Sequence, residues 1–336
     1  MSLVVFGSAN LDLFITVPSL PLAPGSTSFT STKNPFLRKA CGGKGANQAI
    51  ASANLLGKDK VTFVGNMGSS SGFGSVLREN FAKFGVIVIE VEGEFERVCE
   101  CGTAVIMVSE ANGDNVIVVA PGSNFEIPAI TTINNPVISA LLTSPNSHLL
   151  LTQFETPPRS VLEILTHFKK TTILNPAPSP DKWAISEQPL FAEILLNVTI
   201  LIPNEEELVG CYSSLFPGVL PIPDFQLLAG EILTAFPNLQ AIVVTLGAKG
   251  AMVVTQGGGS VNVHEDGSPW KDDPVVDTVG AGDAFCGAFA TKLLRNNEDL
   301  VDAARFGCKC AGYSVRKEGA QTSYITITQE EEEEVE

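Results

Sequence analysis

Basic residues are scarce in this sequence. Its 336 residues include 21 Lys and Arg against 37 Asp and Glu, and the net charge at pH 7 is −16. Proteins that bind nucleic acid neutralise its phosphates with a high density of lysine and arginine. The composition therefore argues against nucleic acid as a partner, although a small phosphorylated ligand could still bind through local backbone N–H groups.

Paired metal-binding residues are also missing. The seven cysteines form no Cys-x2-Cys pair, and the three histidines lie far from the close cysteines, Cys99 with Cys101 and Cys308 with Cys310. Zinc sites usually show two spaced pairs together with histidine. We therefore expect no structural zinc, and free thiols suit a reducing cytosol.

Long apolar runs are absent as well. None approaches the ~20 residues of a membrane-spanning helix, and no signal peptide precedes the apolar run Leu3–Phe6. With 44% hydrophobic residues the chain can still bury a large core. These features predict a soluble, cytoplasmic protein without membrane contact, and a nuclear location stays open.

Negative charge is concentrated at the C-terminal end. Residues 329–336 include Glu330–Glu334 and Glu336. A block of like charge repels itself and stays solvated. We expect a single folded domain over residues 1–328, followed by a disordered acidic tail over residues 329–336.

One stretch combines glycines with an acid where a helix should begin. Residues 277–285 read Asp-Thr-Val-Gly-Ala-Gly-Asp-Ala-Phe, and the small apolar run Ala284–Leu294 predicts a buried helix. The first N–H groups of a helix have no internal partner and lie at its electropositive end, so an anion can bind there. Asp283 could then take a proton from a hydroxyl that attacks the anion, as in phosphoryl transfer. The alternative is a tight turn with an Asp in the first turn of an ordinary helix.

A second glycine-rich stretch lies near the N-terminus. Residues 41–48 read Cys-Gly-Gly-Lys-Gly-Ala-Asn-Gln, and a helix is predicted from about Ala46 to Leu56. The glycines bring the backbone near a ligand, which Lys44 and Asn47 could face. It is not a Walker A loop, because the Ser or Thr after Gly-Lys is missing. The alternative is a helix entry with a solvated lysine.

Several strand patterns occur in the first 120 residues. Leu3–Phe6 predicts a buried strand, and the alternation in Asn10–Val17 places Asn10 and Asp12 on one side of the next strand. These two residues either face solvent or hydrogen-bond a polyol. We expect one small sheet from residues 12–16, 26–37, 102–109 and 115–120, with a hairpin turn at Asn112-Gly113.

Strands and helices alternate after residue 148, which favours a parallel α/β sheet. The predicted strands are residues 148–152, 171–174, 198–202, 241–245 and 251–255. Ligands of such sheets gather at the carboxyl ends of the strands. Asn204 and Glu207 lie there, share one face of a helix start and could hold waters around Mg²⁺. The alternative for Asn204 is an ordinary helix cap.

Together these stretches resemble the ribokinase (PfkB-type) family of carbohydrate kinases, from Val4 to about Tyr324. The two glycine-rich signatures carry most of the resemblance. Gly7-Ser8-x-Asn10-x-Asp12, Asn175-Pro176-Ala177-Pro178, Pro203-Asn204-Glu205 and Gly319-Ala320-Gln321 add order and spacing.

The resemblance implies a fold and a reaction. The fold is a three-layer α/β/α arrangement with a mostly parallel central sheet and a β-sheet lid, built from segments near residues 12–40 and 100–120, that also forms a homodimer. The reaction is ATP-dependent phosphorylation of D-ribose at O5 to ribose 5-phosphate. A sister kinase acting on deoxyribose, fructose or a nucleoside is the alternative.

The resemblance also implies roles for individual residues. Asp283 would be the general base, and the N–H groups of Gly280, Ala281 and Gly282 would stabilise the transferring phosphoryl group. Ribose would be held by Asn10, Asp12, Gly43, Lys44, Asn47 and Glu155. ATP would lie over Asn204, Thr245, Gly247, Lys249, Gly250, Gly282 and Cys308.

Two metal ions complete the implied site. Mg²⁺ would be held by Glu207 through water. K⁺ would lie near Asp277, Val279, Ser314, Lys317, Gly319 and Ser323, largely on carbonyl oxygens. The sequence departs from the family pattern at Cys308, where bacterial members tend to carry His, at Lys317, where Arg is common, and at Cys101, before Gly102-Thr103. These departures bear on nucleotide affinity, cation affinity and choice of sugar.

Overall fold

A nine-stranded sheet forms the centre of the molecule within the residues that the computed structural model describes, 2–25, 27–69, 72–91, 100–128, 134–264, 273–295 and 299–326. Its strand order is β13-β12-β11-β10-β9-β8-β1-β4-β5, and all pairs from β11 to β5 are parallel. The strands are β1 (Ser2–Phe6), β4 (Val61–Gly65), β5 (Ile87–Glu90), β8 (Ser147–Thr152), β9 (Thr171–Leu174), β10 (Ile200–Leu201), β11 (Ala241–Thr245), β12 (Ala251–Thr255) and β13 (Ser260–Val263).

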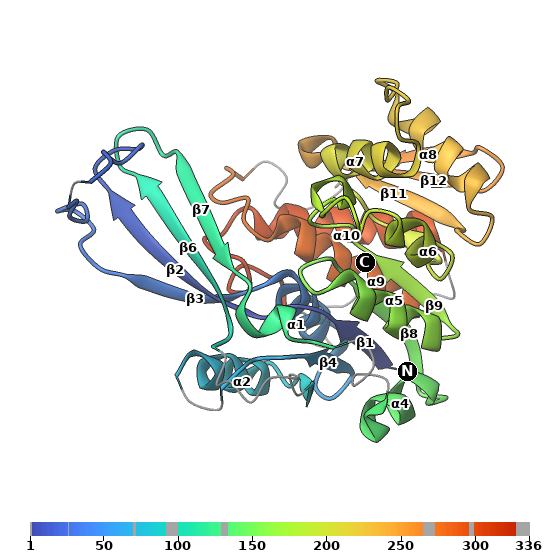
Figure 1. Cartoon of the computed structure of the whole chain (residues 1–336), viewed down its shortest axis with the longest axis horizontal. Helices are drawn as coiled ribbons and strands as arrows, with labels where there is room; N and C mark the ends of the chain where they lie inside the picture. Colours follow the sequence, from blue (N-terminus) through green and yellow to red (C-terminus); the bar gives the residue numbers. More distant parts are fainter. Residues whose placement is uncertain are drawn as a thin grey trace.

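Helices cover both faces of this sheet (Figure 1). One face packs against α1 (Lys44–Leu56), α2 (Phe73–Lys83), α9 (Ala281–Arg295) and α10 (Leu300–Ser314). The other packs against α4 (Pro136–Thr143), α5 (Pro158–His167), α6 (Leu190–Leu195), α7 (Glu205–Leu215) and α8 (Phe225–Ala235).

The strands explain this layering. Leu3 and Val5 of β1 point into one core and Val4 and Phe6 into the other, because successive side chains of a strand alternate between faces. An unbroken apolar strand therefore needs cover on both sides. The predicted three-layer, mostly parallel fold is confirmed. Within the described residues, no helix has the length and apolarity to cross a membrane.

A second, four-stranded sheet projects from the body (Figure 1). Its order is β3-β2-β6-β7, from β3 (Arg38–Gly42), β2 (Asn10–Val17), β6 (Gly102–Ser109) and β7 (Asn115–Ala120). We call this sheet the lid, and the prediction of a small separate sheet is confirmed. The strands predicted within Ser26–Leu37 are wrong, because residues 27–37 form none and Arg38–Gly42 pairs with β2 instead.

One strand of the central sheet runs against its predicted direction. Ala251–Thr255 was expected to be parallel to its neighbours, but β12 is antiparallel to β11. Only the short turn around η3 (Gly247–Lys249) joins the two strands. A parallel pair needs a crossover of a dozen or more residues, so this connection allows only an antiparallel return.

Helices α1 and α9 pack closely at a glycine. A Cβ atom on Gly287 would lie 2.6 Å from Ala51 Cβ and 2.9 Å from the Gln48 carbonyl oxygen. Ser52 Oγ bridges the same place, because it donates to the carbonyls of Gln48 (2.8 Å) and Gly287 (3.2 Å). The contact brings the first turns of both helices together, and these turns carry the predicted site residues.

Replacing Gly287 with Ala should therefore destabilise the protein. The added methyl group meets atoms closer than van der Waals contact, and overpacking of this kind costs about 1–3 kcal/mol. Urea unfolding measures the free-energy change. Gly230→Ala in α8 is the matched control, because a Cβ there has no neighbour within 4 Å and alanine should be neutral or stabilising in a helix. Equal stability of both variants would contradict the close packing.

Candidate active site

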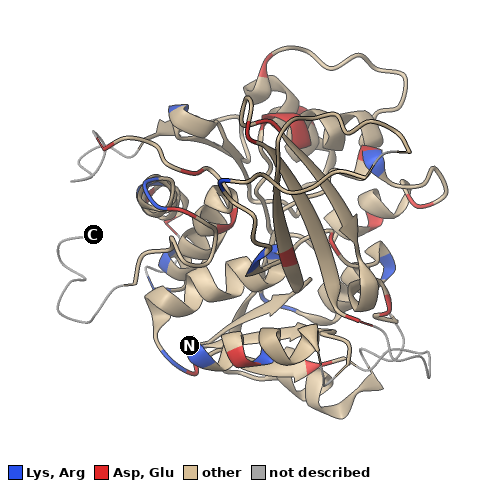
Figure 2. Ribbon diagram, turned by 90° about the vertical axis from the view of Figure 1, so that its left-hand side faces the viewer, with Lys and Arg blue, Asp and Glu red and all other residues tan. Residues whose placement is uncertain are grey.

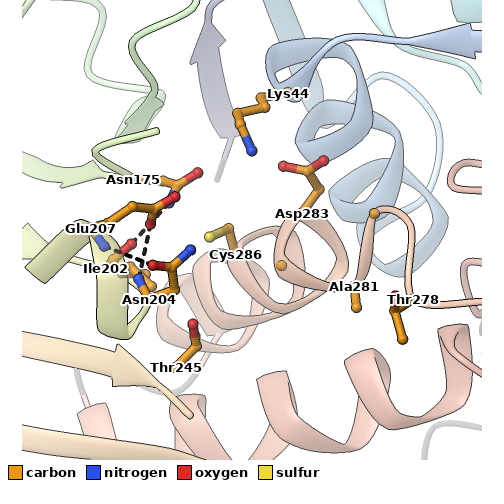
Figure 3. A pocket seen from close by; sticks show the side chains of 12 residues that line it. Lys44, Asn175, Ile202, Asn204, Glu207, Thr245, Thr278, Ala281, Asp283 and Cys286 are labelled. Atoms are coloured by element: carbon orange, nitrogen blue, oxygen red, sulfur yellow. Dashed lines mark hydrogen bonds between the residues drawn. The ribbon is translucent and has the colours of Figure 1, made fainter. Parts of the chain in front are cut away.

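A cavity of about 210 Å³ opens where α1 and α9 begin, at the carboxyl ends of β9 to β11. This is the edge at which parallel α/β sheets hold ligands. Figure 3 shows Lys44 and Asp283 on one side, with Asn204 and Glu207 across the cavity. The lining residues are Lys44, Asn175, Ile202, Asn204, Glu207, Thr245, Thr278, Gly280, Ala281, Gly282, Asp283 and Cys286.

The start of α9 is shaped by Gly280. Its φ of +76° lies in the left-handed region, and a Cβ there would lie 2.6 Å from Ala320 Cβ and 2.7 Å from the Tyr324 hydroxyl. Its carbonyl accepts from Ala284 N (2.8 Å) and Tyr324 Oη (3.2 Å). The N–H of Ala281 donates to the Thr278 carbonyl at 3.3 Å. The other N–H groups of the first turn have no earlier helical carbonyl to bind, so they can bind a ligand in the cavity.

Asp283 is buried in that first turn, with 6% of its surface exposed. Asn47 Nδ2 donates to its Oδ2 (2.9 Å) and Gln48 Nε2 to its Oδ1 (3.0 Å). Burial raises the pKa of Asp283, although Lys44 and the two amide donors act in the opposite direction. A carboxylate with a raised pKa is a better proton acceptor than an ordinary one.

Lys44 is surrounded by acids. Burial lowers the pKa of its amine, but the negative charges of Asp283, Glu155 and Glu207 outweigh burial, and the pKa lies above its ordinary value. The lysine is therefore positively charged at neutral pH and can attract an anion into the cavity. Its backbone N–H is held by Glu155 Oε2 at 2.9 Å, and the same oxygen accepts from Ser8 Oγ at 2.6 Å.

The predicted sugar-binding residues meet beside this cavity. Burial, followed by the charges of Glu155 and Asp283, raises the pKa of Asp12 to about 7, so these three carboxylates share one region. Asn10 is buried and its Oδ1 accepts from Asn124 Nδ2 at 2.7 Å. Gly43, with φ +87°, lies against the backbone of residues 9 and 10. The structure thus brings the six residues predicted for ribose to one place beside Asp283.

The opposite wall carries the residues predicted for the nucleotide. Asn204 Oδ1 accepts from Glu207 N (2.8 Å) and Glu207 Oε2 accepts from Asn204 N (2.9 Å), which is a capping box at the start of α7. The helix-cap alternative for Asn204 is therefore correct, and the cap still lines the cavity. Burial raises the pKa of Glu207. Thr245 lies beside Asn204 and leads into the exposed turn that contains Gly247, Lys249 and Gly250.

Cys308, predicted for the nucleotide, and Lys317, predicted for K⁺, do not border the cavity. Cys308 is buried in the core and its thiol faces the Val263 carbonyl at 3.9 Å. Lys317 is exposed and its amine contacts the Tyr313 hydroxyl.

The residues predicted for K⁺ come from two loops that Asp277 joins and, at Ser314, from the last turn of α10. Asp277 Oδ2 accepts from Gly319 N (2.9 Å) and Oδ1 from Val279 N (3.0 Å). Ser323 Oγ donates to the Ala320 carbonyl (2.7 Å) and Ser314 Oγ to the Ala311 carbonyl (2.8 Å). Asp277 thus holds the two loops together next to the start of α9. Backbone carbonyl oxygens, which these loops contain, are ligands that suit K⁺.

Several residues around the site were not predicted. Gln48 and Gln321 lie inside the quoted motifs, but a motif does not tell which side chain contacts Asp283. Cys286 follows Asp283 by three residues on the same helix face, a spacing that could have indicated it. The residues that sequence reasoning missed are Gln48, Asn124, Asn175, Cys286, Gln321 and Tyr324.

Known proteins are similar to this chain in sequence and in overall fold. A family model described as pfkB family carbohydrate kinase matches residues 1–327. A ribokinase of Dictyostelium discoideum is 33% identical, with 96% of this chain and 97% of that protein covered. The crystal structure of a Thermotoga maritima ribokinase superposes with a TM-score of 0.79 at 29% identity, covering 100% and 99%. An Arabidopsis thaliana ribokinase complexed with ribose and ATP gives 0.76 at 27% identity, covering 96% and 95%.

Proposed function

We propose that this chain, which belongs to the pfkB family of carbohydrate kinases, phosphorylates D-ribose at O5 with ATP and releases ribose 5-phosphate and ADP. The family and its relatives establish a kinase that transfers phosphate to a sugar. The observation that carries the finer proposal is the placement of Asp283. Its carboxylate lies between the amide-bearing face of α1 and the start of α9.

Ribose is the acceptor that suits the groups beside Asp283. A sugar presents several hydroxyls, each of which needs a donor or an acceptor. Asp12 and Glu155 supply acceptors, Lys44 supplies donors, and Asn10 and Asn47 supply both, while the bare backbone of Gly43 allows close approach. The similar Arabidopsis protein was solved with ribose and ATP, which supports the same pair of substrates here.

The chemistry follows from the positions of the groups. The O5 proton passes to a carboxylate oxygen of Asp283 while O5 forms a bond to the γ-phosphorus. The bond from that phosphorus to the β–γ bridging oxygen breaks, and ADP leaves with the electron pair. Negative charge on the transferring group is stabilised at the α9 N-terminus by the N–H groups of Gly280 and Gly282, and by Lys44. The N–H of Ala281 would join them on leaving the Thr278 carbonyl. We assign ATP to the wall of Asn204, Thr245, Gly247, Lys249 and Gly250.

Mg²⁺ fits the acidic wall across from Asp283. No group of three His, Cys, Asp or Glu side chains among the described residues could hold a metal ion by itself. A magnesium ion that keeps most of its waters and binds the ATP phosphates needs only one protein carboxylate. Glu207 can supply that carboxylate through water, and bound Mg²⁺ would neutralise charge on the phosphates.

K⁺ would order the loops that support the α9 start. The Asp277 and Gly319 loops offer a carboxylate and several carbonyl oxygens within one small region. We assign the ion to Asp277, Val279, Ser314, Lys317, Gly319 and Ser323. This position lies outside the phosphate path, so K⁺ would act by fixing the backbone.

The lid offers a surface for a homodimer. In Figure 2, which looks toward the lid, charged residues are few on its strands, and β6 and β7 contain none. Val116, Ile117, Val118 and Val119 on β7 are 43–58% exposed, and a contiguous apolar strand of this kind suits a protein interface. We propose that two copies pair through their lids. We also propose a cytoplasmic location, which six free thiols among the described cysteines support.

A panel of acceptors tests the proposed reaction. ATP consumption should be measured with ribose, 2-deoxyribose, fructose and a nucleoside, with K⁺ or Na⁺ at equal ionic strength. We expect ribose to give the highest kcat/KM and K⁺ to raise the rate. Turnover of fructose or a nucleoside without turnover of ribose would assign the chain to a sister kinase. Equal rates in K⁺ and Na⁺ would contradict the proposed potassium site.

A further inference from the structure

A continuous chain of amide side chains, buried except for the half-buried Asn80 at one end, runs through Asp283. On one side, Asn80 Nδ2 donates to Gln321 Oε1 (2.7 Å), Gln321 Nε2 to Asn47 Oδ1 (2.8 Å), and Asn47 Nδ2 to Asp283. On the other side, Gln153 Nε2 donates to Gln48 Oε1 (2.6 Å), and Gln48 Nε2 donates to Asp283 and to Asn175 Oδ1 (3.1 Å). We call this set the amide chain: Asn80, Gln321, Asn47, Gln48, Gln153 and Asn175.

The amide chain has one direction, and the carboxylate imposes it. An ionised carboxylate can only accept hydrogen bonds, so Asn47 and Gln48 must both turn an NH₂ group toward Asp283. Their oxygens then face away and require donors, which Gln321 and Gln153 provide. Gln153 keeps this orientation although its Oε1 has no partner among the described residues.

The outer members of the amide chain are anchored independently. Asn175 Nδ2 donates to the Ile202 carbonyl at 2.9 Å, which turns its oxygen toward Gln48. A Cβ on Gly7 would lie 2.2 Å from Gln153 Oε1, so Gln153 lies directly over the backbone after β1. Gln48 and Gln153 are 0% exposed and Gln321 is 5% exposed. Unmade hydrogen bonds are costly at such depth, so each amide has little freedom to turn.

From this geometry we infer that Gln48 and Gln321 are positioning residues for Asp283: Gln48 holds its carboxylate directly, and Gln321 holds Asn47 in the orientation that binds it. The inference rests on the proposed role of Asp283 as general base. It adds a link between the C-terminal loop and the reacting group, because Gln321 lies between Gly319 and Ser323.

Loss of either link should make Asp283 harder to ionise. The hydrogen bonds from Asn47 and Gln48 lower the pKa of Asp283, since donors stabilise the charged form. Without one of them the pKa rises, the base is protonated at a higher pH, and activity is lost earlier on acidification. The other titratable groups that face Asp283 stay in place in such variants; they are Asp12, Lys44, Glu155, Glu207, Cys286 and Tyr324.

The test uses the full-length protein and ATP-dependent ribose phosphorylation at saturating ATP and K⁺. Gln48→Met keeps the side-chain volume and removes the amide. We expect kcat to fall about tenfold through misplacement of the base and the acid limb of kcat against pH to rise by about one unit. The ribose KM should change little, because Gln48 is not among the proposed sugar contacts. Gln321→Met should shift the acid limb of kcat upward by a smaller amount. It should also raise the ribose KM, because Asn47, a proposed sugar contact, loses the donor that orients it.

Gln256→Met is the matched control. Gln256 Nε2 bonds three carbonyls, those of Leu233, Phe236 and Leu239, far from the cavity. Its replacement should lower thermal stability and leave the acid limb unchanged. If Gln48→Met does not fold, Asn80→Ala at the half-buried outer end of the amide chain replaces it as the test. We expect this variant to shift the acid limb upward by a smaller amount. A folded variant of Gln48, or of Asn80 in its place, with the wild-type limb would overturn the inference.

Asp283→Ala in the same assay separates this inference from the proposed function. Full activity of Asp283→Ala would contradict the proposed role of Asp283 as general base. A large loss in Asp283→Ala, together with an unmoved acid limb in Gln48→Met, would leave the base in place and reject only the positioning role.

Discussion

Replacing Asp283 by Asn should lower kcat by roughly 10²–10⁴-fold, the usual contribution of a general base. The substitution keeps the size of the side chain and removes its ability to take a proton. Sugar binding should largely persist, because the proposed contacts on β2, at Lys44 and at Glu155 keep their chemical groups. The measurement is kcat for ribose phosphorylation together with the ribose Kd from calorimetry in the absence of ATP.

The matched control for this prediction is Asp224→Asn. Asp224 caps α8 by accepting from Leu227 N at 3.1 Å, and Asn caps a helix about as well as Asp. The control makes the same change of charge away from the cavity and should retain wild-type kcat. Near-normal turnover of the Asp283 variant would dismiss the general-base role.

The Asn variant also has a geometric consequence. Asp283 accepts from Asn47 and Gln48 at the same time, but an Asn side chain offers one acceptor and one donor. One of the two amides must then face an NH₂ group, so the amide chain has to turn or break. Asp283→Ala presents no donor to the two amides but leaves both without an acceptor. The two variants thus disturb the surroundings differently, and a similar loss of kcat in both would point to the missing base.

The sequence predicted the central fold because its periodicity is strong. Apolar runs such as Leu3–Phe6 match β1, and the alternation of Asn10–Val17 matches β2 with the same ends. The failure at Ser26–Leu37 has a physical cause. β-branched and aromatic residues favour strands only where they can pack, and Phe29 and Phe36 are 83% and 76% exposed. The true strand, Arg38–Gly42, carries the pairing with β2.

The site was predicted unevenly for a related reason. Glycines and the acid at a helix start are local features, so Gly280 and Asp283 could be found from spacing alone. The contacts of Gln48 and Gln321 could not, because they depend on how α1 packs on α9 at Gly287 and on where the C-terminal loop returns. For Asn204 two interpretations apply at once, because the same residue caps α7 and lines the cavity.

Gly280→Ala should be the second most damaging change. Alanine at a φ of +76° is strained, and its Cβ would lie 2.6 Å from Ala320 Cβ and 2.7 Å from the Tyr324 hydroxyl. The start of α9 must therefore shift, and its N–H groups would no longer meet the phosphoryl group. Loss of one such donor costs about 10²–10³-fold in kcat, which we expect here in steady-state assays.

Strain alone has to be separated from this effect, and Gly258→Ala does so. Gly258 has a φ of +83° in the turn between β12 and β13, and a Cβ there has no neighbour within 4 Å. Alanine at such a φ costs about 1 kcal/mol or more, so this control should lose stability in urea and keep kcat. If Gly280→Ala loses stability in the same way and retains kcat within about twofold, the backbone at the start of α9 does not stabilise the transferring group. A selective loss of kcat would instead tie that backbone to phosphoryl transfer, because the two variants share the strained conformation and differ in whether they border the cavity.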